Sequence, residues 1–455
     1  MSILLLVPGL ISFFLVWRGR IETAFLSVYL PCLLLLPNEY SLRIPHLPPL
    51  STAEFALIPL GFVGLFRLIR SGSFALMDLL VVLYAASVSL SEILHARVLN
   101  DGIFASMEAF VALVLAYMAG RQLIEPDLRF ATVRRFVVLV LLNGFHGVYE
   151  WRMGQNMYGI IGHRILGIED ISENMQLRNG HARIGAVFGG GECAGIAFAM
   201  TFCMHSWLVY LRKIKAPVDL GNTLTKLEKY HVPELLLLLY VWLTQSRGPQ
   251  LSLAAAFLIL LIPRFKNTRL MTALVAVLLV GGYVAAGAYF ASYTNVTDPT
   301  AVTEQQGSAV YRRAMNEQYA PIAEAGGLTG WGLGFPRIGG MKSIDNNYLL
   351  VHLSSGLLGY ITFVLIAWEN IRVLLVRSWK FQGAEDRAFV FSMLAMMTVL
   401  WLTLLTVFLG AQLPQFSFLL IGWIQSMVPG KAAQYPSAQI AEIRNEKFAL
   451  RRVFT

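Results

Sequence analysis

The segment Ser292-Tyr-Thr-Asn295 opens the longest polar interval in this chain, which continues through Tyr311-Arg-Arg313 and Gly330-Trp-Gly-Leu-Gly334 to Asp345-Asn-Asn-Tyr348. The sequence before this interval is apolar, and an apolar segment follows it from about Leu349. Loops held by a rigid scaffold commonly carry binding and catalytic residues. We therefore expect the function of the protein to reside in this polar interval.

The composition excludes a soluble globular protein. Of the 455 residues, 56% are hydrophobic and only 14% are charged, whereas soluble chains average about 25% charged residues. The net charge of +9 is better explained by the excess of Lys and Arg on the cytoplasmic loops of membrane proteins than by nucleic-acid binding. Cys32, Cys193 and Cys203 lie in or beside apolar segments without Cys-x-x-Cys spacing, which predicts buried thiols rather than a disulfide or a metal site.

Apolar segments recur along the chain at the length of a membrane span, about 17 to 25 residues. They predict an all-α polytopic membrane protein with about 12–13 transmembrane helices and a large periplasmic loop. The two short segments around Trp242 and Phe257 could form a single broken hairpin. The expected spans are 2–17, 23–36, 53–69, 74–94, 103–119, 136–149, 191–211, 233–245, 249–262, 270–291, 348–376, 389–409 and 414–428.

The distribution of basic residues predicts how these spans are oriented. Lys and Arg concentrate in alternate loops, those that follow residues 17, 69, 119, 211, 262 and 376, and in the tail 430–455. Such loops face the cytoplasm, which places the N-terminus in the periplasm and the C-terminus in the cytoplasm. The outer loop 150–190 and the large loop 292–347 then both face the periplasm. We expect one integral membrane domain, 1–455, without a separate soluble domain.

Arginines gather in the predicted outer loops. Arg183 precedes a span, Arg247 interrupts the hairpin of two short spans, and Arg312 and Arg313 lie in the large loop, where Glu317 could pair with Arg313 at i,i+4. A charge at membrane depth costs about 2.5–3.5 kcal/mol on insertion scales, so it is usually paired or faces a polar cavity. The planar arginine fork suits phosphate and carboxylate groups. An oxyanion site is one interpretation; a snorkelling Arg247 and a solvated helix face at Arg312 and Arg313 are the alternatives.

Asp345-Asn-Asn-Tyr348 stands directly before an apolar helix. Asp or Asn at this place is a natural N-cap, and a carboxylate at the mouth of an outer cavity could also act as a general base, so both roles stay open for Asp345. Gly330–Gly334 lacks the preceding strand and the following Lys-Ser/Thr helix of a phosphate loop, and loop closure is the expected role of its glycines. No histidines and carboxylates have metal-ligand spacing.

Three segments, in this order, resemble the O-antigen ligase and O-antigen polymerase superfamily of bacterial glycan-assembly enzymes. The first is Arg183-Ile-Gly-Ala-Val-Phe188, which enters a span, and the second is the turn Thr244-Gln-Ser-Arg-Gly-Pro-Gln-Leu251. The third is the large loop described above together with Gly356-Leu-Leu-Gly359. These segments are similar to the arginine-led span entry, the Ser-Arg-Gly turn and the large periplasmic loop of that family.

The resemblance implies a metal-independent glycosyltransferase of the bacterial inner membrane that uses no cofactor. Such an enzyme takes a glycan from an undecaprenyl-diphosphate carrier and joins it to a glycan or lipid acceptor on the periplasmic face, among membrane lipids and without nucleic acid. By motif match, Arg247 and one or both of Arg312 and Arg313 would hold the diphosphate, with Arg183 as a weaker candidate. Arg247 would also be catalytic, and Asp345 would be the catalytic carboxylate at the position of the family's loop histidine. Support for the loop and the helix cap would come from Asn346, Asn347, Tyr348, Gly332 and Gly334.

The sequence departs from the family pattern at two places. Asp345-Asn346 stands where the family often has His-Asn, and Gly189-Gly-Gly-Glu192 stands where a Pro-Asn pair is frequent. Both departures favour a polymerase-like or exopolysaccharide role over ligation to a lipid A core. The competing class is a transporter or flippase of an anionic or lipid-linked substrate, which often shows inverted repeats; the sequence has no such repeat. A non-catalytic scaffold for envelope assembly is a third hypothesis.

Overall fold

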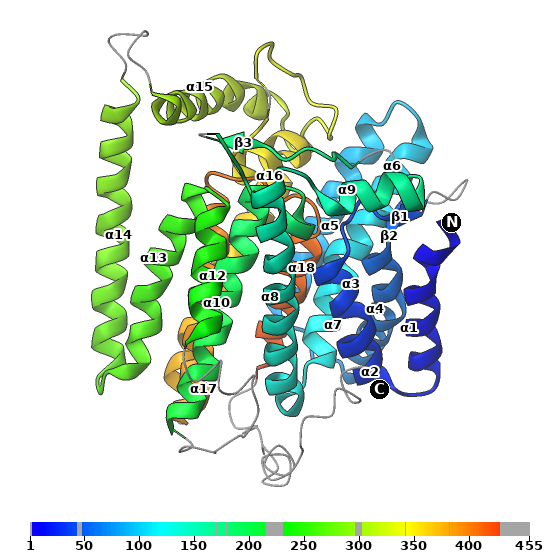
Figure 1. Ribbon diagram of the computed structural model, residues 1–455, viewed down its shortest axis with the longest axis vertical. Coiled ribbons are helices and arrows are strands. Elements are labelled where there is room, and N and C mark those ends of the chain that lie inside the picture. Colours follow the sequence, from blue (N-terminus) through cyan, green and yellow to red (C-terminus); the bar gives the residue numbers. More distant parts are fainter. Residues whose placement is uncertain are drawn as a thin grey trace.

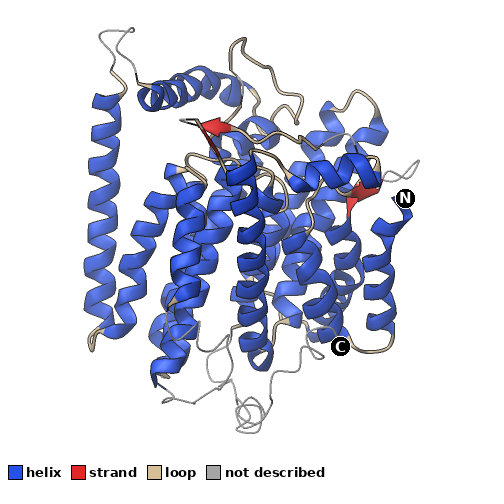
Figure 2. Ribbon diagram, in the orientation of Figure 1, coloured by secondary structure: helices blue, strands red, loops and turns tan. Residues whose placement is uncertain are grey.

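The computed structural model describes residues 2–42, 48–168, 171–178, 180–214, 231–295, 303–341, 343–381 and 383–427. The predicted basic tail 430–455 lies outside these residues. Within them the chain is an all-α polytopic membrane protein, in which long helices run side by side and strands occur only as two short hairpins (Figure 2). Among the described residues, seven helices are long and apolar enough to cross a membrane, and three shorter apolar segments accompany them.

Each of the thirteen predicted spans falls on one helix or on a run of consecutive helices. The first part of the chain contains η1 (Ser2–Leu6), α1 (Val7–Trp17), α2 (Ile21–Ala24), η2 (Phe25–Tyr29), α3 (Leu30–Leu35), β1 (Ser41–Leu42), β2 (Leu50–Ser51), α4 (Thr52–Ser71), α5 (Leu76–His95), α6 (Leu99–Ala109), η3 (Phe110–Leu115), α7 (Ala116–Leu123), η4 (Pro126–Leu128) and α8 (Arg129–Met153). The remainder contains α9 (Met157–Ile161), η5 (Gly162–Leu166), β3 (Leu177–Arg178), β4 (His181–Ala182), η6 (Ala186–Phe188), α10 (Gly191–Ile214), α12 (Val232–Leu243), α13 (Arg247–Leu261), η7 (Ile262–Arg264), α14 (Thr268–Tyr293), α15 (Glu304–Ala325), α16 (Asn347–Lys380), α17 (Ala384–Thr403) and α18 (Leu413–Ser426).

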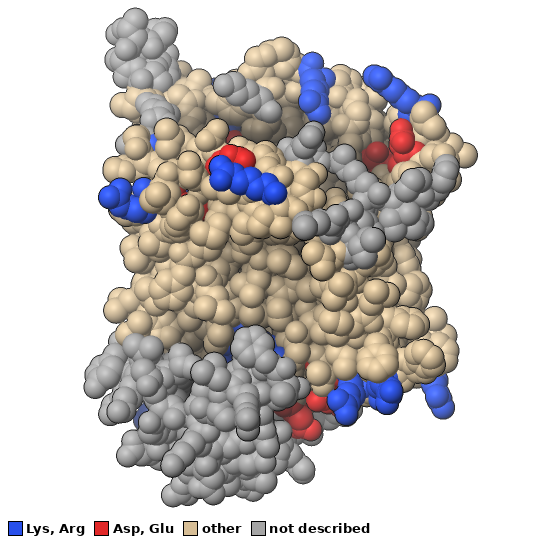
Figure 3. All heavy atoms as spheres, turned by 45° about the vertical axis from the view of Figure 1, so that its right-hand side comes forward, with Lys and Arg blue, Asp and Glu red and all other residues tan. Residues whose placement is uncertain are grey.

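The outside of the bundle carries the apolar surface that a membrane would cover. On the face drawn in Figure 3, acidic and basic side chains gather towards the two ends and leave the middle band to other residues. The helix α14 stands at the edge of the bundle (Figure 1), and Val275 is its one buried side chain. A helix this apolar with nearly every face exposed requires a lipid environment, since soluble proteins rarely expose such large apolar patches.

One end of the bundle collects the polar elements that the sequence places between spans. The helix α15 lies across this end, where α9 and the β3–β4 hairpin also lie (Figure 1). Its inner face carries Met315, Tyr319 and Ala323, all buried, in a small second core that also contains Phe335 and Leu353. These positions repeat every four residues, as one face of a helix requires. The large loop predicted at 292–347 is therefore built on a 22-residue helix.

The loop that follows α15 is fixed to α16 at a break in that helix. Gly356 has φ +63° and ψ −164°, which interrupts the helical hydrogen bonding. The loop replaces the lost bonds: Trp331 N donates to Leu353 O and Gly332 N to Ser354 O, both at 2.9 Å, while the amides of Leu357 and Leu358 donate to the carbonyls of residues 327 and 328. Broken helices persist in membranes only where the freed groups find partners.

Two glycines allow the two backbones to meet at this break. A Cβ on Gly330, where φ is +74°, would lie 2.3 Å from Gly356 N, and a Cβ on Gly356 would lie 2.3 Å from Gly330 N. Real Cβ contacts are never this short, and the left-handed conformation strains any other residue. At Gly330 the expected role in loop closure is therefore close packing of the loop backbone against the backbone of α16.

Gly330→Ala should destabilise the protein because it adds a left-handed strain of about 1–2 kcal/mol to a backbone clash. We expect a fall of several degrees in the melting temperature of the purified protein in detergent. Gly334→Ala is the matched control, because a Cβ there meets no atom within 4 Å. Equal melting temperatures for the two variants would contradict the described contact.

Candidate functional site

The turn between α12 and α13 presents an arginine at a helix start. The Thr244 hydroxyl donates to Val241 O at 2.7 Å and accepts from Ser246 N at 3.3 Å, which ends α12. Gln245 takes a left-handed φ of +51°, and Ser246 is extended, so that α13 begins at Arg247. This geometry makes Arg247 the first residue of α13, at the N-terminus of that helix.

Arg247 is available to a ligand at this end of the bundle. Its side chain is exposed, and it has no hydrogen-bond or ion-pair partner among the described residues. The first amides of a helix lack intrahelical partners and carry the positive end of the helix dipole. An anion at this position would therefore meet a guanidinium and a helix N-terminus together, a combination suited to phosphate.

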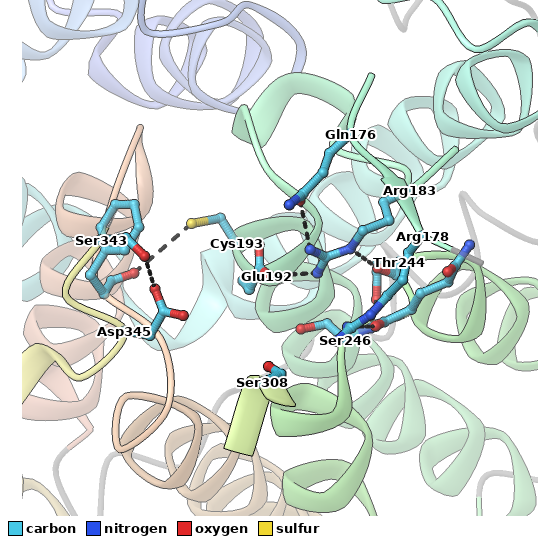
Figure 4. A network of polar contacts seen from close by, with 12 residues as sticks. Gln176, Arg178, Arg183, Glu192, Cys193, Thr244, Ser246, Ser308, Ser343 and Asp345 are labelled. Atoms are coloured by element: carbon cyan, nitrogen blue, oxygen red, sulfur yellow. Dashed lines mark hydrogen bonds and ion pairs between the residues drawn. The ribbon is translucent and has the colours of Figure 1, made fainter. Parts of the chain in front are cut away.

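Arg183, by contrast, is buried and fully engaged inside the protein. Its guanidinium donates to Glu192 Oε1 at 2.6 Å, to Gln176 Oε1 at 2.7 Å and to Thr244 O at 3.1 Å (Figure 4). The side chain is only 4% exposed. These bonds tie the entry to α10 to the turn that bears Arg247. Direct contact of Arg183 with a diphosphate remains a prediction, and the geometry supports a role in positioning that turn.

One face of α15 meets the segment before α16. Arg312 Nη2 lies 3.7 Å from Asp345 Oδ2, and Arg312 Nη1 donates to Ser308 Oγ at 3.4 Å. Four residues further on, Asn316 Oδ1 accepts from Asn346 Nδ2 at 3.1 Å. The residues 308, 312 and 316 share one helix face because they lie four apart. This face brings a guanidinium and the Asp345 carboxylate together.

Arg313 points to a different side of α15. Its Nε donates to Glu317 Oε1 at 2.8 Å, as the i,i+4 spacing predicts, and its Nη1 donates to Thr294 Oγ1 at 3.3 Å. Its side chain is 44% exposed, against 27% for Arg312. Of the two neighbouring arginines, Arg312 is therefore the one that faces Asp345.

The helix cap of α16 is Asn346. Its Oδ1 accepts from Tyr348 N at 3.1 Å and from Leu349 N at 3.3 Å. Asp345 is not engaged in capping; its Oδ1 accepts from Ser343 Oγ at 2.6 Å, and its side chain remains 28% exposed. The structure thus assigns the cap to Asn346 and leaves the Asp345 carboxylate open for chemistry.

The turn between α17 and α18 contacts both the segment that bears Asp345 and the segment that bears Arg247. Asn347 N donates to Leu404 O, and Asn347 Oδ1 accepts from Leu409 N, both at 2.9 Å. Tyr348 adds a bond from its hydroxyl to Trp401 O at 3.2 Å. On its other side the same turn packs against the Arg247 segment, because a Cβ on Gly248 would lie 2.6 Å from the Thr406 hydroxyl. Arg247 and Asp345 therefore flank one short segment.

A comparison with known families covers this part of the molecule. Residues 234–364 match the family model described as O-antigen ligase. This segment of the chain is similar to the O-antigen ligase family. This confirms the predicted resemblance to the O-antigen ligase and polymerase superfamily. The matched range includes Arg247, Arg312, Arg313 and Asp345, whereas Arg183 lies before it. No curated protein matches the chain.

Sequence reasoning missed several residues in and around the matched segment. Ser308 and Asn316 could have been found from their i−4 and i+4 spacing to Arg312. The segment Leu404–Gln412 is largely apolar and gives no sign that it contacts both the Asp345 and the Arg247 segments.

Among the described residues, no group of three His, Cys, Asp or Glu side chains could hold a metal ion, and the three cysteines are free and buried.

Asn346→Ala should cost about 1 kcal/mol of stability, because it removes the N-cap of α16. Asn346→Asp keeps a capping oxygen and should retain most of that stability. Asp345→Ala should cost less than Asn346→Ala, since the ion pair it breaks is partly exposed and such pairs contribute about 0–1 kcal/mol. Thermal unfolding of the three purified variants measures the order. A larger loss for Asp345→Ala would mean that Asp345 is the cap.

Proposed function

We propose that this protein is a glycosyltransferase that transfers or polymerises a glycan carried on undecaprenyl diphosphate, at the periplasmic face of the bacterial inner membrane. Glycan transfer of the O-antigen ligase or polymerase type follows from the matched family; the carrier and the side of the membrane are our proposal. The observation that carries it is Arg247 at the start of α13, which has no hydrogen-bond or ion-pair partner among the described residues and lies within the matched segment. Exopolysaccharide or O-antigen polymerisation and ligation are both compatible with this arrangement.

The reaction needs positive charge where the leaving group forms. An acceptor hydroxyl attacks the anomeric carbon of the donor sugar, the bond from that carbon to the diphosphate oxygen breaks, and negative charge develops on the lipid diphosphate. Preorganised cations aimed at developing charge are usually the largest catalytic contribution. Arg247 and Arg312 are proposed to hold the diphosphate without a metal ion or other cofactor, since guanidinium forks match phosphate oxygens.

Asp345 is proposed as the general base. Its carboxylate is partly exposed and lies 3.7 Å from the Arg312 guanidinium, so that a base and a diphosphate-binding cation stand together. It would take the proton that the acceptor hydroxyl loses as the new glycosidic bond forms. Asn346 and Asn347 support this carboxylate by capping α16 and by fixing it to the α17–α18 turn.

The proposal also includes the orientation of the protein in the membrane. The lipid tail of the carrier requires apolar surroundings, and its head must reach the polar end of the bundle. The apolar helices below the Arg247 turn satisfy the first requirement, and the arginines of that end satisfy the second. We therefore propose that this end, with loops 150–190 and 292–347 and the N-terminus, faces the periplasm, and that the C-terminus is cytoplasmic.

The break in α16 is the observation that favours a transporter, because transporters bind substrates at discontinuous helices. In this chain the freed groups around Gly356 are already bonded to the loop 327–332. The amides of Leu357 and Leu358 and the carbonyls of Leu353 and Ser354 are therefore not open to a substrate at that point. This leaves the Arg247 helix start as the better anion site, and transfer as the better account.

Arg247→Ala should lower product formation by about 100-fold or more, the range found when one preorganised donor to a developing charge is removed. Arg312→Ala should also lower it strongly, because the same charge develops between both arginines. The measurement is glycan transfer from polyprenyl-diphosphate oligosaccharide by purified protein in nanodiscs, at matched membrane insertion. Full activity of Arg247→Ala would refute the proposed role.

Two arginine variants serve as controls in this assay. Arg152→Ala removes an exposed arginine at the end of α8 and should leave transfer unchanged. Arg313→Ala removes the neighbour of Arg312 that is bonded to Glu317 and Thr294, and should retain much more activity than Arg312→Ala. Loss of activity in Arg313→Ala with retention in Arg312→Ala would reverse the proposed assignment.

A further inference from the structure

A cavity of about 210 Å³ opens beside the entry to α10. The connection after α3, the start of α9, the segment 171–176 and the residues 183–191 form its walls. Apolar side chains such as Ile171 and Val187 contribute to the lining. The polar side chains that line it are Glu39, Asn156, Ser172, Asn174, Gln176 and Arg183. No residue of this set has a role in the proposed transfer other than Arg183, which positions the Arg247 turn.

The floor of the cavity is held from beneath by buried polar side chains of α8. Glu150 is fully buried, and its Oε2 accepts from Gly185 N at 2.9 Å and from Ala186 N at 2.7 Å. Asn143 Oδ1 accepts from Val187 N at 3.2 Å. These three hydrogen bonds from two buried side chains hold the backbone of the floor in place. A preformed site loses little free energy to ordering when a ligand binds.

The glycine run in front of Glu192 makes one wall from bare backbone. A Cβ on Gly191 would lie 2.8 Å from Thr244 O, and a Cβ on Gly189 would lie 3.4 Å from Glu39 Oε1. The departure from the family pattern at 189–192 thus has a physical reason. The glycines admit close contacts and leave space, and Glu192 supplies the partner of Arg183.

The charges of the lining disfavour an anion. Arg183 is neutralised by Glu192 at 2.6 Å. The Glu39 carboxylate has no hydrogen-bond or ion-pair partner among the described residues. Burial of the neighbouring Tyr40, together with the negative charge of Glu39, raises the pKa of Tyr40 to about 12. A phosphate in this cavity would face a carboxylate that no described residue compensates. The diphosphate therefore belongs at Arg247 and not here.

The remaining hydrogen-bonding groups suit a neutral polyhydroxyl ligand. Gln176 Oε1 accepts from Arg183 and Asn156 Oδ1 accepts from Tyr158 N, which fixes both amides with their NH₂ groups available as donors. Glu39 contributes acceptors, and Asn174 contributes both kinds of group. A sugar ring presents hydroxyls that donate and accept at its edge and C–H groups on its faces, which matches a lining that combines polar and apolar side chains.

The size of the cavity limits the ligand. Water occupies about 30 Å³ per molecule in the liquid, so the volume corresponds to roughly seven waters. Pockets for drug-sized ligands are about 300–1,000 Å³. The cavity is thus suited to a single sugar ring with part of a chain extending from its open side.

We propose that this cavity binds one sugar residue of the glycan substrate. The proposal rests on the proposed function and extends it to the glycan. Arg183 connects the two sites, since it lines the cavity and donates to Thr244 O, three residues before Arg247 (Figure 4). The bound residue belongs either to the donor glycan near its diphosphate or to the acceptor chain, and the chemistry of recognition is the same for both.

Direct binding tests the cavity without the transfer reaction. The probe is the oligosaccharide released by mild acid from the lipid-linked glycan of the bacterium that encodes the protein, titrated into full-length protein in nanodiscs. Gly190→Leu should fill the cavity, since a Cβ on Gly190 meets no atom closer than 3.7 Å, and should weaken binding at least tenfold. Asn174→Ala should weaken it several-fold. Glu173→Gln, which alters the adjacent side chain bonded to His163, should bind as wild type.

The outcomes separate this inference from the proposed function. No binding by wild type, equal binding by Gly190→Leu, or displacement by inorganic pyrophosphate would overturn the cavity assignment even if transfer occurs. Binding that depends on Gly190 and Asn174 in a protein that transfers nothing would uphold the cavity and refute the proposed function. Where transfer occurs, Gly190→Leu should raise KM at least tenfold for one substrate, and that substrate identifies the source of the sugar. An unchanged KM for both substrates would contradict the inference.

Discussion

The site depends on one buried interaction, the three-way engagement of the Arg183 guanidinium. It bonds the segment before β3 through Gln176, the start of α10 through Glu192, and the end of α12 through Thr244. A buried arginine is tolerated only when it is paired and its donors are satisfied. All three elements must be in place to satisfy the hydrogen-bond donors of the guanidinium. Because Thr244 lies in the turn before α13, this one side chain helps to fix where α13 begins.

The arginines at this end of the molecule are therefore of two kinds, those that the protein compensates and those that it leaves available. Arg183 is compensated and holds the structure. Arg247 lies three residues beyond Thr244, whose carbonyl accepts from Arg183; it is exposed and has no partner among the described residues. Arg312 lies between these cases, since Asp345 compensates it partly at 3.7 Å. An entering diphosphate would add negative charge where the protein has left positive charge unbalanced. The cavity beside Arg183 has the opposite character and suits the uncharged part of the same substrate.

The sequence predicts the helices well because their signal is local. A span is recognised by its own apolar residues, and all thirteen predicted segments fall on helices. The Arg313–Glu317 pair is also local, being set by helix periodicity alone. The match of residues 234–364 to the O-antigen ligase family agrees with a resemblance that rests on short motifs and their order.

What the sequence could not predict depends on contacts between distant segments. The break at Gly356 is visible only when residues 327–332 are placed against it, and the role of Leu404–Gln412 has no sequence signature. The choice between Arg312 and Arg313 as the partner of Asp345 requires knowing which face of α15 meets α16. The Asp345–Asn346 ambiguity is of the same kind, because both residue types can cap a helix and only the geometry distinguishes them.

Glycan release from its carrier is the most direct test of the account. Purified protein in nanodiscs would be supplied with a polyprenyl-diphosphate oligosaccharide, with and without EDTA, and the lipid and glycan products would be analysed by mass spectrometry. The account predicts that glycan leaves the diphosphate at the same rate in both conditions, either onto a longer chain on the same lipid or onto another acceptor. Saturable binding of the lipid with no transfer to any acceptor would contradict it and favour a transporter.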